Sequence, residues 1–416
     1  MMVDVVVIGA GLAGLASALR LSHSGASVVV LARGVGSLHL GGATIDVLGY
    51  SPERVAAPGA VLRDLVASTP DHPYSRVGVH TVGAAIDWFL SQKELGRFEG
   101  GLERNFLLPT AVGGVKPSAV VPQSIAGGDV EREGTVVIVG FSRLKDFYPA
   151  LVADNLDAAG VHARAVTLDV PLPAPLTREA DVGGLGYARS LEDRDFLKSV
   201  IGALESQVEP GDRVGFPAVL GTTAATTVPV ELADGLGCGV FEIPTLPPSV
   251  PGIRLYEALC AAIKGVGGRI VVGPLVVGGH GSGARLESID VDAGARVTAY
   301  RADAFILASG GVSAGGVVMD SRWRITEPVL GLPVSYVPEP GGARFDADYF
   351  GRHPVARAGI AIDGNCRPIS GAEPVYENVF VAGATVGGAE PWREGSGNGI
   401  SLATGWRAAE SIMQGM

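Results

Sequence analysis

The sequence predicts an α/β protein in which both ends of the chain build one parallel-sheet domain and the middle forms a mixed α+β insertion. At the amino end, an apolar strand over residues 3–8 leads through a glycine turn into a helix that ends near Ser24, and a second apolar strand covers residues 28–31. Near the other end, an apolar segment over residues 378–382 opens into glycines ahead of the last helix. Strands that alternate with helices are typical of a parallel sheet covered by helices.

The first turn has the pattern G-x-G-x-x-G, formed by Gly9, Gly11 and Gly14. In such turns the first glycine permits the tight turn, the second lets a pyrophosphate approach the backbone, and the third lets the helix lie close to the strand. The start of the helix, with Leu12 and Ala13, then offers free N–H groups and a partial positive charge to a phosphate. A chain with 61 glycines contains some chance matches, but this position between strand and helix favours dinucleotide or flavin binding over a purely structural turn.

The second strand lacks the carboxylate that such units usually carry at its end to bind the ribose hydroxyls of an adenosine. It ends instead at Ala32-Arg33. The missing charge-assisted hydrogen bond would be worth about 1.5–3 kcal/mol, which makes FMN a serious alternative to FAD. FAD is still possible if Arg33 or backbone groups contact the adenosine half.

A loop of small residues over 34–46 follows this strand. It leaves the carboxyl end of a strand, where the ligands of such sheets bind, so we favour cofactor contact over a flexible surface turn. The contacts predicted from the strand end and the loop are Ala32, Arg33, Gly34, Ser37, Gly41, Gly42, Ala43 and Thr44.

Composition limits the possible functions. With 416 residues, 47% of them hydrophobic, the chain is long enough for two domains with a large core. A net charge of −11 argues against nucleic acid as a ligand. Three widely separated cysteines predict reduced thiols and no metal or iron–sulfur site in this chain. The chain begins directly with the first strand, and its longest uncharged run, residues 214–230, contains four threonines and two prolines, so we expect neither a signal peptide nor a membrane span.

The middle of the chain contains a second strand–helix–strand pattern without a glycine motif, which indicates a separate domain and not a second nucleotide site. The proline- and glycine-rich stretch after it is typical of a cap over an active site. We therefore expect a flavin-binding domain of residues 1–50 and 252–416 and a cap of residues 51–251. The helices expected in the middle are 82–95, 142–159, 191–205 and 231–236, and the strands are 135–139 and 163–170.

From residue 252 the pattern becomes regular again, with a helix over 253–264 and strands over 269–272, 286–291 and 295–301. A buried strand over 302–311 follows and ends in small residues, as in flavin domains that complete their sheet beneath the cofactor; an ordinary core strand is equally consistent. The cofactor contacts predicted in this half are Val277, Ala308, Ser309, Gly310, Gly383, Ala384, Gly397, Asn398, Gly399, Ile400 and Ser401.

The start of the last helix, residues 397–401, is the candidate contact for the flavin ring. Reduced flavin carries negative charge near N1 and the C2 oxygen, and a helix N-terminus aimed there would stabilise it. An ordinary N-cap formed by Asn398 or Ser401 is the alternative, and the two are compatible.

Together these motifs resemble the flavoproteins of the glutathione-reductase type with the fumarate-reductase variation, which implies a Rossmann-like flavin-binding domain with an inserted α+β cap. A closer resemblance, over most of the chain, is to the B subunits of anaerobic glycerol-3-phosphate dehydrogenases, a family that also usually lacks the ribose-binding acid. The matching segments are Arg33-Gly34, Ser37-Leu38-His39, residues 44–50, His72-Pro73-Tyr74, Lys116-Pro117, Gly140-Phe141, residues 146–149, residues 151–156, Gly359-Ile360 and Arg367-Pro368.

The resemblance implies oxidation of sn-glycerol 3-phosphate to dihydroxyacetone phosphate, with electrons passed to a quinone. It also implies two partner subunits, one bearing FAD and the other carrying iron–sulfur centres at the membrane, and a flavin in this chain for which FMN is usually cited. The expected location is cytoplasmic, with attachment to the inner face of the membrane through a partner subunit. The alternatives are an electron-relay subunit without a substrate site, and a stand-alone FAD-dependent dehydrogenase or reductase of the fumarate-reductase type acting on another small substrate. A third alternative is a protein of this fold that has lost its cofactor.

Oxidation of a phosphorylated secondary alcohol needs a base and a cationic group for the phosphate. Arg393 and Lys116 are the candidate anion-binding residues, and His39 and His353 are the candidate bases. For each of these side chains a purely structural role is the alternative.

Overall fold

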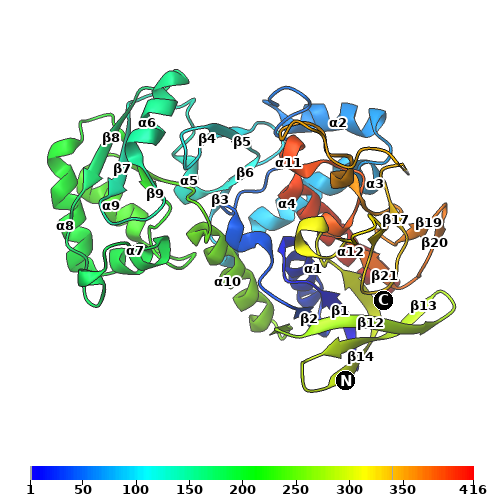
Figure 1. The fold of residues 1–416 in the computed structure, drawn as a ribbon. Helices are drawn as coiled ribbons and strands as arrows, with labels where there is room; N and C mark the ends of the chain where they lie inside the picture. The colour runs from blue at the N-terminus through cyan, green and yellow to red at the C-terminus, as the bar shows by residue number, and fades with distance from the viewer. Residues whose placement is uncertain (1, 340) are drawn as a thin grey trace.

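The computed structural model describes residues 2–339 and 341–416 and has two lobes (Figure 1). The larger lobe is built on a seven-stranded sheet with the order β11-β2-β1-β14-β13-β12, in which β21 also pairs with β14. Its strands are β1 (Met2–Ile8), β2 (Val28–Ala32), β11 (Arg269–Val272), β12 (Leu275–Ser282), β13 (Arg285–Asp292), β14 (Val297–Leu307) and β21 (Val379–Val381).

Strand β14 joins the two halves of this sheet. Its first residues pair antiparallel with β13, and from Arg301 to Leu307 it runs parallel to β1. Because β11, β2, β1 and β21 are parallel to this second part, their carboxyl ends meet at one edge. The predicted strands 295–301 and 302–311 are therefore one long strand, and the turn begins at Ala308. Strand β12 was missed, since the three glycines in it weaken a strand pattern.

Helices from both chain ends cover this sheet. Helix α1 (Leu12–His23) packs against α12 (Gly397–Gly415) and α10 (Val250–Gly265). Small residues allow the close contact, since a Cβ on Gly405 would lie 2.5 Å from the carbonyl oxygen of Ala13. The N- and C-terminal segments thus share one core.

Three further helices, α2 (Pro58–Ser68), α3 (Pro73–Val77) and α4 (Val79–Ser91), contribute side chains to this same core. A second core begins at Val136 and ends at Val250. On this packing, we propose that the cap comprises residues 136–250, a smaller segment than the 51–251 expected from the sequence.

The smaller lobe contains a parallel sheet with the order β10-β9-β7-β8 (Figure 1, green). The predicted helix 142–159 begins only at Pro149, because a proline favours the first helical position and the residue before it avoids the helical conformation. Its elements are β7 (Val136–Phe141), α6 (Pro149–Ala158), β8 (Ala163–Leu168), α7 (Gly184–Leu191), α8 (Arg194–Leu204), β9 (Arg213–Pro217), α9 (Val228–Leu236) and β10 (Gly239–Ile243).

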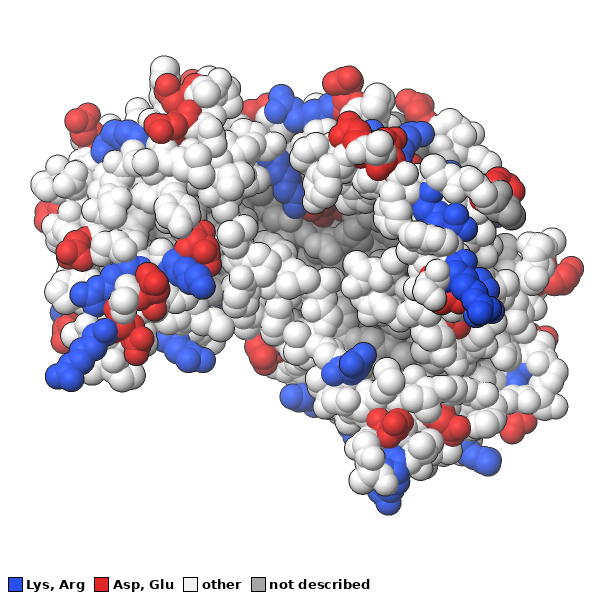
Figure 2. Space-filling view, viewed as in Figure 1, with Lys and Arg blue, Asp and Glu red and all other residues white. Residues whose placement is uncertain are grey.

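Short elements connect the lobes and cover the C-terminal half. They are β3 (Phe98–Gly100), β4 (Phe106–Pro109), β5 (Val115–Ser118), β6 (Val120–Pro122), α5 (Gln123–Ala126), β15 (Val318–Met319), β16 (Ile325–Thr326), β17 (Val334–Ser335), β18 (Gly359–Ile360), β19 (Ile369–Ser370), β20 (Glu373–Pro374) and α11 (Pro391–Glu394). Figure 2 shows a hollow between the lobes, and charged side chains of both signs scattered over this face.

None of the helices in the described ranges is long and apolar enough to cross a membrane. Within residues 2–339 and 341–416, no cluster of three or more His, Cys, Asp or Glu side chains could hold a metal ion. All three cysteines are free thiols.

Candidate functional site

The glycine turn after β1 touches the turn after β14. The Gly9 N–H donates to the carbonyl of Leu31 at 2.8 Å, and the Ala308 N–H donates to that of Ile8 at 2.8 Å. A Cβ on Gly9 would lie 2.1 Å from the carbonyl oxygen of Ala308, and its φ of +116° is one that L side chains rarely adopt. Only glycine therefore lets these two strand ends meet, and predicted cofactor contacts from distant parts of the chain come together.

The other two glycines of the motif have different surroundings. A Cβ on Gly14 would lie 2.0 Å from the carbonyl oxygen of Gly9, so Gly14 closes the helix onto the strand. At Gly11 an added Cβ would meet no atom within 4 Å. Helix α1 has no side-chain cap and no acidic residue in its first turn. The opening at Gly11 is thus a cradle with unopposed N–H groups, which fits a phosphate.

The loop after β2 folds back over this cradle. A Cβ on Gly36 would lie 2.9 Å from both the nitrogen and the Cα of Gly11. Ala32 is buried at the end of β2, while Arg33 and Gly34 are exposed beside it. Ser37 begins the short 3₁₀ helix η1 (Ser37–Leu40), and the loop ends in the buried residues Ala43 and Thr44.

The opposite wall is formed by the segments after β14 and β21. The hydroxyl of Ser309 is buried without a hydrogen-bond partner in the chain. The Gly310 N–H donates to Thr385 Oγ1 at 3.0 Å, and the Gly383 N–H donates to Thr404 Oγ1 at 2.8 Å. We did not predict these two threonines, because nothing in their local pattern distinguishes them from other buried threonines. The orphaned Ser309 hydroxyl and the open face of Gly11 are features that a polar ligand such as flavin would complete.

The first turn of α12 is fixed to the same loop. Asn398 Nδ2 donates to the carbonyl of Thr44 at 2.7 Å, and the Gly399 N–H donates to that of Asp46 at 2.9 Å. The N-cap is Ser396, so the alternative of a cap formed by Asn398 or Ser401 is wrong. No acidic residue lies in the first turn itself, and the positive end of the helix dipole lies there.

Lys116 belongs to a polar cluster beside this turn. Its ammonium group pairs with Asp46, which also accepts hydrogen bonds from Thr44 Oγ1 at 2.9 Å and Ser118 Oγ at 2.6 Å. Asp46 is thus fully engaged as an acceptor, while the Lys116 side chain is 45% exposed and retains donors for a ligand. Asp46 was not among the predicted site residues, although it lies in the motif 44–50.

Arg393 lines a pocket of about 620 Å³ together with Arg352 and Arg357. Its nearest carboxylate contact is Glu390, at 3.7 Å, and Arg352 approaches the same carboxylate only to 3.8 Å. Arg357 has no ion-pair partner within the described residues. The pocket therefore presents three guanidinium groups, and the carboxylates of Asp64 and Glu390 lie among its lining residues. His72 and Glu394 also line it.

Both predicted histidine bases contact neighbouring protein groups. His353 accepts a hydrogen bond from the Asp346 N–H at Nδ1, and its Nε2 lies 2.9 Å from the carbonyl of Tyr349. His39 packs edge-to-face on Tyr256, and burial lowers its pKa. Catalytic roles for both stay predictions, as does the cofactor contact of Val277, which is exposed on β12.

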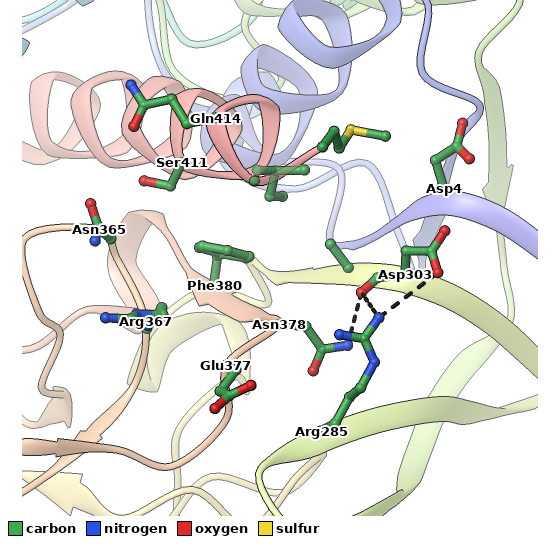
Figure 3. A pocket seen from close by; sticks show the side chains of 14 residues that line it. Asp4, Arg285, Asp303, Asn365, Arg367, Glu377, Asn378, Phe380, Ser411 and Gln414 are labelled. Carbon is green, nitrogen blue, oxygen red and sulfur yellow. Dashed lines mark hydrogen bonds and ion pairs between the residues drawn. The ribbon is translucent and has the colours of Figure 1, made fainter.

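A second pocket, of about 430 Å³, lies where the polypeptide enters β1, and Figure 3 shows its side chains. Most of its charged groups already have partners. Arg285 forms an ion pair with Asp303, and Asp4 accepts a hydrogen bond from the Ser27 hydroxyl. No residue of the predicted site lines it.

Comparison with known proteins identifies the family. A family model described as an FAD binding domain matches residues 4–400. The probable B subunit of anaerobic glycerol-3-phosphate dehydrogenase from Halobacterium salinarum is 35% identical over 427 residues, covering 99% of this chain and 98% of its own length. The chain belongs to the B-subunit family of anaerobic glycerol-3-phosphate dehydrogenases. The corresponding protein of Pectobacterium atrosepticum is 30% identical, with 99% and 98% coverage. Among solved structures, a 3-ketosteroid Δ1-dehydrogenase from Sterolibacterium denitrificans matches at 12% identity, with a TM-score of 0.48 and full coverage of both chains.

As a member of this family, the chain is a flavin-binding oxidoreductase, and the predictions of an α/β flavin fold and of a flavin cofactor are confirmed. The residues that fit the cofactor are the cradle at Gly11, the orphaned hydroxyl of Ser309 and the first turn of α12. When bound there, flavin would supply a two-electron acceptor.

Proposed function

We propose that this chain is the flavin-carrying subunit of a complex that oxidises sn-glycerol 3-phosphate to dihydroxyacetone phosphate. Its partners would be an FAD-bearing protein and an iron–sulfur protein, which pass the electrons to a quinone at the membrane. Full-length similarity to proteins named as the B subunits of this dehydrogenase carries the proposal. The mass of the flavin released on denaturation distinguishes FMN from FAD.

We further propose that the chain binds the substrate itself. The pocket beside α11 contains three guanidinium groups, and Arg393 connects it to the turn that starts α12. A planar guanidinium suits a phosphate dianion, since it can donate two parallel hydrogen bonds. Lys116 adds a partly exposed cation that pairs with Asp46. The neighbouring Pro117 and Gly395, which follows α11, both lie against Gly49, since a Cβ added there would contact both residues.

Anaerobic titration of the isolated chain with glycerol 3-phosphate tests for a substrate site in this chain. We expect the flavin absorption band to bleach without the FAD-bearing partner, because the phosphate-binding pocket belongs to this chain. Glycerol, which lacks the phosphate, serves as the control. If glycerol 3-phosphate bleaches the flavin only in the reconstituted complex, the chain is an electron relay. If it bleaches the flavin neither in the isolated chain nor in the complex, the proposed substrate is wrong.

Substitution of Arg393 by methionine is expected to raise the KM for glycerol 3-phosphate by about 10- to 100-fold, since one charge-assisted hydrogen bond to the phosphate is worth about 1.5–3 kcal/mol. Steady-state kinetics of the reconstituted complex measure this effect. Arg324→Met is the matched control, because Arg324 forms a surface ion pair with Asp320 and does not line the pocket. If the KM of R393M were unchanged, Arg393 would not bind the substrate phosphate.

A further inference from the structure

The motif His72-Pro73-Tyr74 at the start of α3 was not among the contacts predicted from the sequence, yet the side chains of His72 and Tyr74 are buried, with exposures of 1% and 0%. The backbone N–H of Tyr74 donates to His72 Nδ1 at 3.1 Å, so the ring hydrogen of His72 lies on Nε2. This Nε2 faces the Glu394 carboxylate at 3.1 Å. His72 therefore donates through Nε2 to a carboxylate.

Glu394 connects this histidine to the two segments next to the flavin site. Its carboxylate also accepts from the Ser396 hydroxyl at 2.7 Å and from the Glu390 N–H at 2.8 Å. Its carbonyl accepts from the N–H groups of Gly49 and Tyr50, at 2.7 and 2.9 Å. Burial raises the pKa of Glu394, but the hydrogen bond and the electrostatic effect of His72, together with the hydrogen bonds from Glu390 and Ser396, outweigh it, so the pKa lies below its ordinary value. The carboxylate is thus held in its charged, accepting form.

Tyr74 makes a second connection between the same segments. Its hydroxyl donates to the carbonyl of Val47 at 2.8 Å and lies 3.4 Å from that of Ser396. The fit is tight, since a Cβ on Gly399 would lie 2.3 Å from this hydroxyl. Burial, together with the carboxylates of Glu394 and Asp46, raises the pKa of Tyr74, so the hydroxyl stays protonated as a donor.

We propose that His72 and Tyr74 are positioning residues that hold the N-terminus of α12 at the flavin, His72 through Glu394 and Tyr74 through Val47 and Ser396. The loop 44–50 and the first turn of α12 are joined by hydrogen bonds. Both segments are also held by the hydrogen bonds of His72 and Tyr74 described above. Because the dipole of α12 favours the negative charge of the reduced cofactor, its placement sets the midpoint potential. The proposal rests on the assignment of this helix N-terminus to the flavin, and its test uses no substrate.

The test is the midpoint potential of the flavin in the intact protein, measured anaerobically against reference dyes without glycerol 3-phosphate. We expect Tyr74→Phe and His72→Leu each to lower the potential by about 30 mV, which is a tenfold change for a two-electron couple. His72→Gln, which can still donate to Glu394, should recover at least half of this shift. Ser396→Ala removes one bond to Glu394 and should give a smaller shift in the same direction.

Matched controls are His280→Gln and Tyr187→Phe. His280 also faces a carboxylate, Asp290, but on the surface strands β12 and β13, and Tyr187 is an equally buried tyrosine in the second core. Both controls should keep the wild-type potential. Potentials within about 10 mV of wild type in Y74F and S396A, with flavin retained, would overturn the proposal, as would equal shifts in the controls. If H72L does not fold, the comparison of H72Q, Y74F and S396A with the controls decides the question.

Discussion

Replacing Gly9 by alanine is expected to destabilise the protein by more than about 3 kcal/mol and to abolish flavin retention. The positive φ of +116° costs an L side chain about 1–3 kcal/mol, and the new Cβ would stand 2.1 Å from the Ala308 carbonyl oxygen. Relief of that clash would separate the turn after β1 from the turn after β14. Urea unfolding monitored by circular dichroism, together with the flavin absorbance of the purified protein, measures both effects.

Substitutions at two other glycines separate the effect of backbone strain from the effect of a side chain in the cradle. Gly25 also has a positive φ, of +90°, but an added Cβ would meet no atom within 4 Å, so Gly25→Ala should cost only the backbone strain and should retain flavin. At Gly11 the φ is −81° and the space is open, so Gly11→Ala should change stability by less than about 1 kcal/mol. Its Cβ would instead occupy the cradle, and we expect at least a tenfold higher Kd for flavin. If G11A bound flavin with wild-type affinity, the cofactor would not contact this turn.

Replacing Glu242 by glutamine is expected to lower the free energy of unfolding by about 3–5 kcal/mol, because it leaves a buried guanidinium without its countercharge. Glu242 is 0% exposed and accepts two hydrogen bonds from Arg254, at 2.7 and 2.9 Å, and one from the Leu220 N–H at 2.8 Å. Arg254 also donates to the carbonyl of Gly221. The pair connects β10 of the smaller lobe to α10 of the larger one, so its loss should loosen the lobes as well.

The measurement is urea unfolding of E242Q and of a matched surface variant, Asp303→Asn. Asp303 and Arg285 are both 56% exposed and 3.8 Å apart, so removal of this charge should cost at most about 1 kcal/mol. If E242Q were no less stable than D303N, the buried pair would contribute little to stability. Limited proteolysis within residues 136–250 checks the expected loosening of the smaller lobe.

The elements predicted best were those with strong local signals. The turn at Gly9, Gly11 and Gly14 was recognised from its spacing alone. In the structure, close backbone contacts restrict Gly9 and Gly14 to glycine, and Gly9 also has a positive φ. The helix over residues 142–159 was placed too early because its hydrophobic pattern continues through Leu144 and Phe147. Both are buried in the loop before Pro149, where a proline decides the helix start.

The cap boundary shows a different limit of sequence reasoning. Residues 58–91 carry no pattern that distinguishes one hydrophobic core from another, and only the packed structure shows that their helices belong to the core of the larger lobe. The candidate catalytic residues show the same limit. Lone histidines and arginines have no local signature for function, and the structure engages both ring nitrogens of His353 with backbone groups, while Arg393 lines a pocket.

The sequence by itself determined the family and the glycine turn, and it predicted that the two chain ends form one site, because glycine positions and strand–helix alternation follow from local sterics. Tertiary structure alone decided which side chains meet there: Asp46 with Lys116, 70 residues apart, and His72 with Glu394, 322 residues apart. The free energy of such pairs comes from burial and hydrogen bonding in the folded chain, which no local pattern encodes. The open cradle at Gly11 was predicted from the sequence, whereas the buried residues that hold α12 beside the site emerged only from the fold.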